Sequence, residues 1–81
     1  MNKTDYPQSS QFGLRLRARR QAVGMSQEAL GVAIGIDESS SRARISRYEL
    51  GVNEPAIAIS RLLAKALQVT VGYFYCYDDL E

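Results

Sequence analysis

The chain has 81 residues, of which 46% are hydrophobic, so it fits one globular domain and is not disordered throughout. It contains a single cysteine, Cys76, and no histidine, which excludes an intramolecular disulfide and the usual zinc ligand sets and favours a reducing compartment. The formal net charge is only +1. No apolar run approaches the roughly 20 residues that cross a bilayer, and residues 1–10 lack the apolar segment of a signal peptide. We therefore expect a cytoplasmic protein.

The beginning of the chain predicts a flexible arm followed by a first helix. Residues 1–10 are polar, and Ser10 can cap a helix that runs from about 11 to 23. Gly24 can end this helix in the left-handed conformation. One face of the helix carries side chains at i, i+4 spacing, namely Phe12, Leu16 and Arg20.

The next segment predicts two further helices separated by a glycine. Ser26 can cap a second helix that runs to about Ile34, and this helix is so short that tertiary packing must stabilise it. Its inward residues are expected to be Leu30, Ala33 and Ile34. A third helix carries residues 42–50 and ends at Gly51. Several residues before it are competent N-caps, namely Asp37, Ser39, Ser40 and Ser41.

The last part of the chain predicts two more helices. Pro55 suits the first turn of a fourth helix, whose apolar stripe is the clearest in the chain and consists of Ile59, Leu62, Leu63, Ala66 and Leu67. Thr70 can cap a short fifth helix that bears Val71, Tyr73 and Phe74 and reaches Tyr77 at the furthest. Strand-like alternation is nowhere sustained. We therefore expect an all-α fold of five short helices, with an arm at 1–10, one domain at 11–75 and an acidic tail at 76–81.

The near-neutral net charge conceals an uneven distribution. Arginines cluster at 15–20 and again at 42–47, whereas acidic residues gather at 78–81. Such basic clusters favour a nucleic-acid partner, although a solvated helix face would give the same pattern.

Two short helices that meet at a glycine, the second of them basic, are the pattern of a helix-turn-helix. Motifs in register support this interpretation: Leu16-Arg17, Gly24-Met-Ser-Gln27, Ala29-Leu30, Ile45-Ser-Arg-Tyr-Glu49, Gly51, Pro55, Ala64-Lys-Ala-Leu67 and Val69-Thr-Val-Gly-Tyr-Phe74. With these motifs the chain resembles the Cro and lambda-repressor type of helix-turn-helix, also called the XRE family, over residues 12–74. The resemblance implies a lambda-repressor-like domain that regulates transcription, places its recognition helix in the major groove of double-stranded DNA and acts as a homodimer.

The chain departs from this family at the front of the recognition helix. It has about four more residues between Gly35 and Ile45 than most members, which is close to one helical turn of 3.6 residues. The additional residues, within 37–41, extend the recognition helix with Asp37 as its cap or lengthen the turn with Ser41 as the cap. We favour the extended helix.

The resemblance implies a set of DNA contacts, which are Ser26, Gln27, Ser41, Arg42, Ala43, Arg44, Arg47 and Asn53. Gln27 matches a glutamine that hydrogen-bonds a phosphate, a contact that positions the protein without reading sequence. Arg42, Ala43 and Arg47 align with base-reading positions, and the guanidinium fork of arginine matches guanine O6 and N7. Ser26 is foremost an N-cap, cap or loop roles are at least as good for Ser41, and Arg44 ranks below the other two arginines.

Other residues have expected roles away from DNA. Arg20 and Glu49 align with a partly buried ion pair that fixes the recognition helix. The remaining arginines of the first helix are expected to form a solvated face, from which one of them could reach a phosphate, namely Arg15, Arg17 and Arg19. We expect Phe74 in the core and a homodimer interface near three tyrosines, namely Tyr73, Tyr75 and Tyr77.

Several classes of function compete at this point. A phage repressor, a restriction–modification controller and an antitoxin-like autoregulator all fit the sequence equally well. An adaptor or antitoxin-like module that keeps the fold but reads little DNA is the alternative, and the arginines of the recognition helix count against it. An enzyme is excluded because the sequence contains no metal-ligand set, phosphate-binding glycine loop or catalytic triad. No cofactor and no small-molecule substrate are expected.

Overall fold

The computed structural model describes residues 11–75, which form five helices and contain no strand. The helices are α1 (Gln11–Ala22), α2 (Gln27–Ala33), α3 (Glu38–Leu50), α4 (Ile57–Leu67) and α5 (Val71–Tyr75). The predicted all-α fold of five short helices is thus confirmed. The predicted arm at 1–10 and tail at 76–81, with Ser10, Cys76 and Tyr77, lie outside the described residues.

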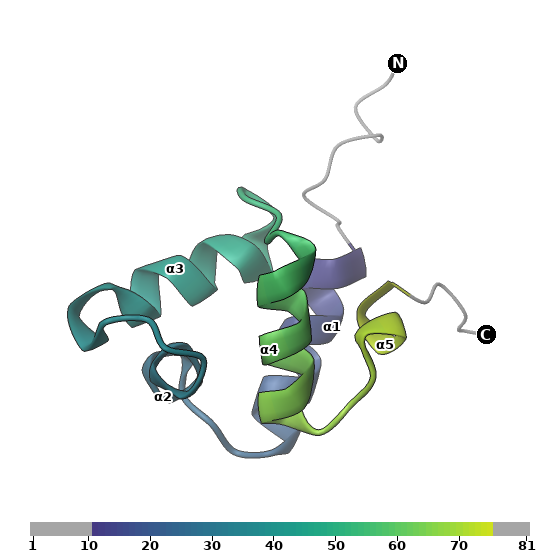
Figure 1. Ribbon diagram of the computed structural model, residues 1–81, viewed down its shortest axis with the longest axis horizontal. Coiled ribbons are helices and arrows are strands. Elements are labelled where there is room, and N and C mark those ends of the chain that lie inside the picture. Colours follow the sequence, from purple (N-terminus) through teal and green to yellow (C-terminus); the bar gives the residue numbers. More distant parts are fainter. Residues whose placement is uncertain (1–10, 76–81) are drawn as a thin grey trace.

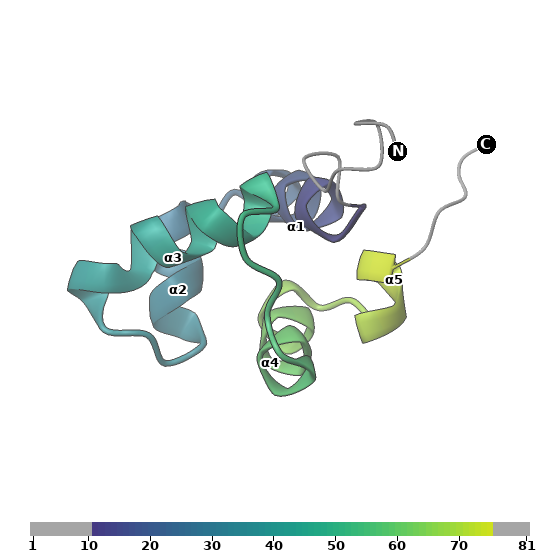
Figure 2. The same ribbon diagram turned by 90° about the horizontal axis from the view of Figure 1, so that it is seen from above.

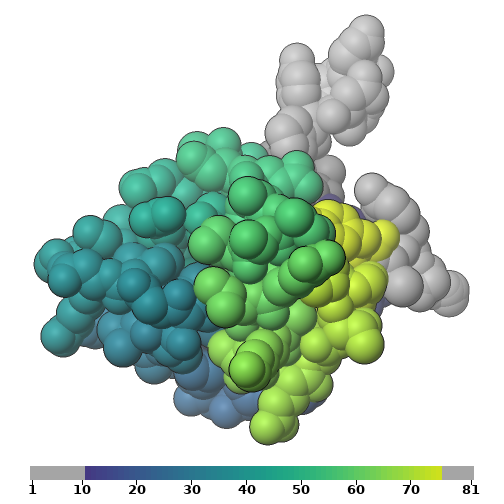
Figure 3. Space-filling view, in the orientation of Figure 1, coloured from purple at the N-terminus to yellow at the C-terminus, as the bar shows by residue number. Residues whose placement is uncertain are grey.

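The helices divide the molecule into two ends around a shared core. α2 and α3 lie at one end and α5 at the other, with α1 and α4 between them (Figures 1 and 2). In the space-filling view α4 covers the centre of one face and separates α3 from α5 (Figure 3). All five helices contribute to the core, which consists of Phe12, Leu16, Leu30, Ile34, Ile45, Tyr48, Leu63, Ala64, Leu67 and Phe74. Within residues 11–75 no helix has the length and apolarity to cross a membrane.

The helix ends follow the expected capping chemistry with one exception. The Ser26 hydroxyl accepts a hydrogen bond from the backbone N–H of Ala29 at 2.9 Å, as an N-cap should. Gly24 and Gly51 adopt the left-handed conformation, with φ of 76° and 80°, and end α1 and α3. Pro55 was expected in the first turn of α4 but lies ahead of it, because Ala56 is the N-cap residue.

Two residues expected in the core are exposed. The inward face of α4 centres on Ser60, Leu63 and Leu67, so Leu62 is turned about 100° away from Leu63 and is 43% exposed. Ala33 is likewise exposed at the end of α2. In both cases the apolar stripe of the sequence is wider than the surface that the neighbouring helices cover.

The front of α3 contains the additional turn, and the favoured extended helix is confirmed. α3 begins at Glu38, and the Asp37 carboxylate accepts a hydrogen bond from the backbone N–H of Ser39 at 3.2 Å. The turn packs tightly against α2: a Cβ atom on Gly31 would lie 2.4 Å from Cβ of Ser41. Glycine therefore allows α2 and the added turn of α3 to approach more closely than any other residue would permit.

Candidate nucleic-acid interface

α3 has one buried face and one exposed face. Its buried residues are Ser41, Ile45, Tyr48 and Glu49. At 100° per residue, Ala43 and Arg47 fall near the centre of the opposite, exposed face. Arg42 lies on the flank toward α1 and α2, whereas Arg44 lies on the flank toward the α3–α4 connection. Three guanidinium groups thus stand on the exposed surface of a single helix.

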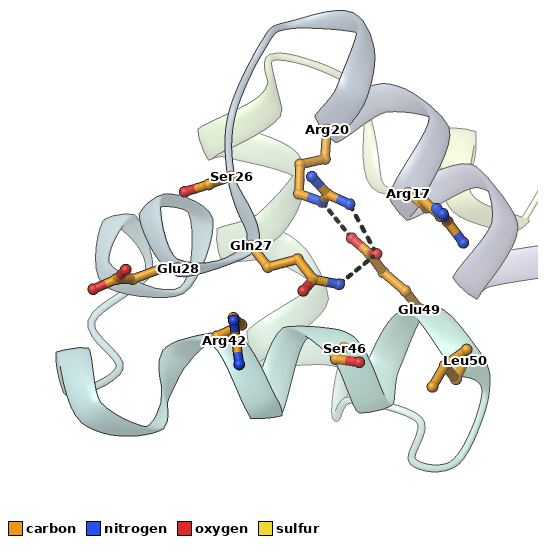
Figure 4. Close-up of a pocket in the computed structure, with 9 residues that line it drawn as sticks. All are labelled: Arg17, Arg20, Ser26, Gln27, Glu28, Arg42, Ser46, Glu49 and Leu50. Carbon is orange, nitrogen blue, oxygen red and sulfur yellow. Dashed lines mark hydrogen bonds and ion pairs between the residues drawn. The ribbon is translucent and has the colours of Figure 1, made fainter.

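A hollow of about 550 Å³ lies beside α3, between α1 and the start of α2 (Figure 4). We call it the basic hollow, and its lining residues are Arg17, Arg20, Ser26, Gln27, Glu28, Arg42, Ser46, Glu49 and Leu50. Arg17 and Arg42 are exposed and make no ion pair within residues 11–75. The hollow therefore contains two exposed guanidinium groups, the carboxylate of Glu28 and several neutral hydrogen-bonding groups.

The Arg20–Glu49 ion pair forms the back of the basic hollow. Nε of Arg20 lies 2.6 Å from Oε2 of Glu49, and Nη2 of Arg20 donates to Oε1 at 3.1 Å. Nη1 of Arg20 also donates to the carbonyl oxygen of Met25 at 2.9 Å. The two side chains are only 10% and 2% exposed. The pair therefore links the end of α1, the α1–α2 connection and the end of α3, and it satisfies the charge of Arg20 internally.

Gln27 belongs to the same network. Its amide Nε2 donates to Oε1 of Glu49 at 3.1 Å, and the side chain lies between Glu49 and Arg42 (Figure 4). Gln27 is half-buried and lines the basic hollow, so the carboxylate of Glu49 fixes the orientation of the amide. The expected phosphate contact of Gln27 stays a prediction.

Ser41, which the sequence offered as a DNA contact, is placed in the interior instead. Its side chain is fully buried, and its hydroxyl lies 2.9 Å from the carbonyl oxygen of Asp37 and 3.1 Å from that of Ile36. The additional turn of α3 carries Ser41 beneath α2, where it contacts Gly31. Ser41 is therefore a structural residue and does not face solvent.

The other expected DNA contacts lie on the surface. Nε of Arg44 donates to the hydroxyl of Tyr48 at 3.3 Å, which turns this arginine along the flank of α3. Asn53 is exposed and lines a second, smaller hollow of about 340 Å³ together with Arg44 and Arg47. Ser26 is exposed at the rim of the basic hollow but is already used as the cap of α2.

The expected solvated face of α1 is wrong for two of its three arginines. The Arg15 guanidinium lies over the ring of Tyr73, 5.1 Å from its centroid, and Nε of Arg19 donates to the carbonyl oxygen of Leu67 at 3.0 Å. Both arginines hold α1 against the α4–α5 region, because a long side chain can pack its stem and still satisfy its charged head.

Sequence analysis left open whether Arg17 reaches a phosphate and did not single out Ser46, and both residues line the basic hollow. A usable signal was nevertheless present in the spacing. Arg17 lies three residues before Arg20, and Ser46 lies three residues before Glu49, so each is a surface neighbour of one member of the ion pair.

Two of the three tyrosines expected at a dimer interface lie within the described residues, near α1 and α4. Tyr73 is half-buried beneath Arg15. Tyr75 is 39% exposed, and its hydroxyl lies 3.2 Å from that of Ser60. Tyr77 lies outside the described residues, and Phe74 is fully buried as expected.

The front end of α3 is acidic, in contrast to its basic middle. A side-chain hydrogen bond with Glu38, together with the charge of that residue, raises the pKa of Glu28 above its usual value. Hydrogen bonds from the side chain and backbone of Ser39 lower the pKa of Asp37. Carboxylates at the first turn of α3 are favourable toward the helix dipole, and they leave Arg42, the next charged residue of α3, as the start of its basic surface.

Comparison with known proteins agrees with this geometry. The helix-turn-helix family matches residues 16–74. An uncharacterized transcriptional regulator in the ATPase CF(0) region of Rhodospirillum rubrum is 40% identical over 81 aligned residues, which cover 98% of this chain and 68% of the relative. An uncharacterized HTH-type transcriptional regulator of Sinorhizobium fredii is 38% identical over 63 residues, 78% of this chain and 41% of the relative. The crystal structure of the transcriptional regulator BswR has a TM-score of 0.80 at 43% identity, over 83% of this chain and 66% of that protein.

The matched region runs from the middle of α1 almost to the end of α5 and so includes α2, α3 and all the residues that line the basic hollow. The chain spans 41% to 50% of the length of three curated relatives from Sinorhizobium and Rhizobium. The family assignment therefore concerns the domain that these helices form. This chain belongs to the helix-turn-helix family of the Cro and lambda-repressor (XRE) type, in which its relatives are named transcriptional regulators.

Proposed function

We propose that this chain regulates transcription by binding specific sites in double-stranded DNA, with α3 as the recognition helix in the major groove. The observation that carries the proposal is the exposed face of α3, which presents Arg42, Ala43 and Arg47 while its other face is buried. The Arg20–Glu49 pair supports the proposal because it holds the end of α3 against α1. A rigidly held helix with outward guanidinium groups can present the same donors to the same base edges at each encounter.

The exposed residues have different proposed roles. Arg47 and Arg42 read base edges, and Ala43 allows the helix to approach the bases closely. Gln27 contacts a backbone phosphate, and Asn53 and Arg44 are backbone contacts on the opposite flank of α3. Ser26 remains a cap at the rim of the interface. With DNA as its partner, the protein is predicted to act in the cytoplasm. It is also predicted to need no cofactor and no small-molecule substrate.

Replacement of Arg47 by alanine is expected to relax specificity at one position of the DNA site. A bidentate arginine–guanine contact typically contributes about 1–3 kcal/mol of discrimination. Operators selected from a random library by the wild type and by Arg47→Ala should therefore differ at that base pair. Arg61→Ala removes the same charge from the exposed face of α4 and should leave the selected sequence unchanged. An unchanged consensus for Arg47→Ala, bound more weakly at every sequence, would assign Arg47 to the backbone instead.

We also propose that the protein binds DNA as a homodimer through the region of Tyr73, Tyr75 and Tyr77. Two recognition helices should then lie about 34–36 Å apart, or a multiple of that distance, to enter successive major grooves on one side of the duplex. The selected operators should contain two half-sites at the corresponding spacing, and light scattering should give a mass of two chains on operator DNA. A single chain bound to a single half-site would contradict the dimer but not the mode of DNA binding.

A further inference from the structure

We propose that the basic hollow binds a DNA backbone phosphate and that Arg17 is the residue of α1 that contacts this phosphate. This inference rests on the proposed function, because it requires α3 to lie in the major groove. It adds a contact from a third helix to those proposed for α2 and α3.

The first argument is the charge that the hollow leaves unsatisfied. Arg20 is paired with Glu49 inside the protein, so it offers no charge to a ligand. Arg17 and Arg42 stand on opposite sides of the hollow, are exposed and make no ion pair within residues 11–75. Glu28 also lines the hollow and interacts electrostatically with Arg42. Arg17 is therefore the guanidinium of the hollow that has no acidic partner among the described residues, and the hollow is suited to an anion on the side of Arg17.

The second argument compares the arginines of α1. Arg15 lies over Tyr73, Arg19 donates to the Leu67 carbonyl oxygen and Arg20 pairs with Glu49; these three arginines hold helices together. Arg17 has no such contact among the described residues, and its side chain extends beside Glu49 and Leu50 at the end of α3 (Figure 4). It is the arginine of α1 that remains available for a ligand.

The third argument is the position of the hollow relative to α3. The hollow lies on the flank of α3 that faces α2, beside the exposed face of α3 that carries Ala43 and Arg47. In a helix-turn-helix the helix before the recognition helix crosses the phosphate backbone, so the strand on this flank must pass over the hollow. Arg17 supplies a planar fork that matches two phosphate oxygens, and Ser46 supplies a neutral hydroxyl donor.

The test compares Arg17→Ala with Arg61→Ala, which removes an equal charge from the exposed face of α4. Binding to the selected operator is measured over a series of salt concentrations. Arg17→Ala should bind about ten-fold more weakly, because a charge-assisted hydrogen bond is lost, and the slope of log K against log salt should fall by about one unit. The selected consensus should stay the same, and Arg17→Lys should retain the salt slope. Arg61→Ala should change neither quantity measurably.

Equal affinities and slopes for Arg17→Ala and Arg61→Ala would overturn the inference while leaving the proposed function intact, provided that the wild type still selects an operator. A wild type that selects no operator would instead remove the proposed function itself. A second arm separates a backbone phosphate from free phosphate: the side-chain N–H signal of Arg17 is followed by NMR as inorganic phosphate replaces chloride at constant ionic strength. Without DNA, we expect no saturable shift of this signal. Saturable binding of inorganic phosphate, combined with an unchanged DNA affinity of Arg17→Ala, would contradict the proposal that Arg17 binds a DNA backbone phosphate.

Discussion

Replacement of Glu49 by alanine is expected to lower the free energy of unfolding by about 3–5 kcal/mol, the typical cost of removing one partner of a buried ion pair. The carboxylate is 2% exposed and accepts hydrogen bonds from Arg20 and Gln27. Without it, the guanidinium of Arg20 stays buried with the Met25 carbonyl oxygen as its remaining partner. In a domain of this size such a loss should lower the melting temperature by more than about 10 °C.

The control for this prediction removes a neutral donor from the same carboxylate. Gln27→Ala deletes one hydrogen bond to Glu49 and leaves the ion pair in place, so it should cost about 0.5–1.5 kcal/mol. A double variant that replaces Arg20 and Glu49 by methionine and leucine should recover much of the stability, because it leaves no uncompensated charge. A Glu49→Ala melting curve identical to that of the wild type would contradict the conclusion that the Arg20–Glu49 pair holds the end of α3 against α1.

The elements that sequence analysis predicted well are those with local causes. Ser26 accepts a hydrogen bond from a backbone N–H at the start of α2, and Gly51 adopts the left-handed conformation that ends α3. Both roles involve only residues a few positions away in the chain. The Arg20–Glu49 pair joins residues 29 positions apart, which no local pattern shows. It was expected only because of the family resemblance.

The parts that sequence analysis missed depend on how closely the helices approach each other. Ser41 looked like an exposed serine at the front of a recognition helix, but the contact between α2 and α3 at Gly31 buries it. Arg15 and Arg19 looked like a solvated face, but α4 and α5 provide a carbonyl oxygen and an aromatic ring within their reach. In each case the partner lies on another helix, and its position is fixed by the packing of the whole core.

The same point explains why a second glycine should tolerate no side chain. A Cβ atom on Gly13 would lie 2.3 Å from the carbonyl oxygen of Glu49 and 2.9 Å from that of Tyr48, and backbone atoms inside α3 cannot move aside as a flexible side chain can. Gly13→Ala should therefore separate α1 from the end of α3 and cost about 2–3 kcal/mol, the upper part of the range for overpacking, despite the better helix propensity of alanine.

The matched control for Gly13→Ala is Gly72→Ala in α5, where a Cβ atom would meet nothing nearer than the Thr70 hydroxyl at 3.9 Å. This variant gains helix propensity without a clash and should be as stable as the wild type or slightly more stable. Urea unfolding of the two variants separates a steric cost from the intrinsic preference of the helix.

Because Gly13 contacts the segment that carries Glu49, Gly13→Ala should also weaken binding to operator DNA by displacing the end of α3, whereas Gly72→Ala should not. Equal stability of the two variants would mean that α1 and α3 can separate at no cost, and the close helix contact would then play no part in holding the recognition helix.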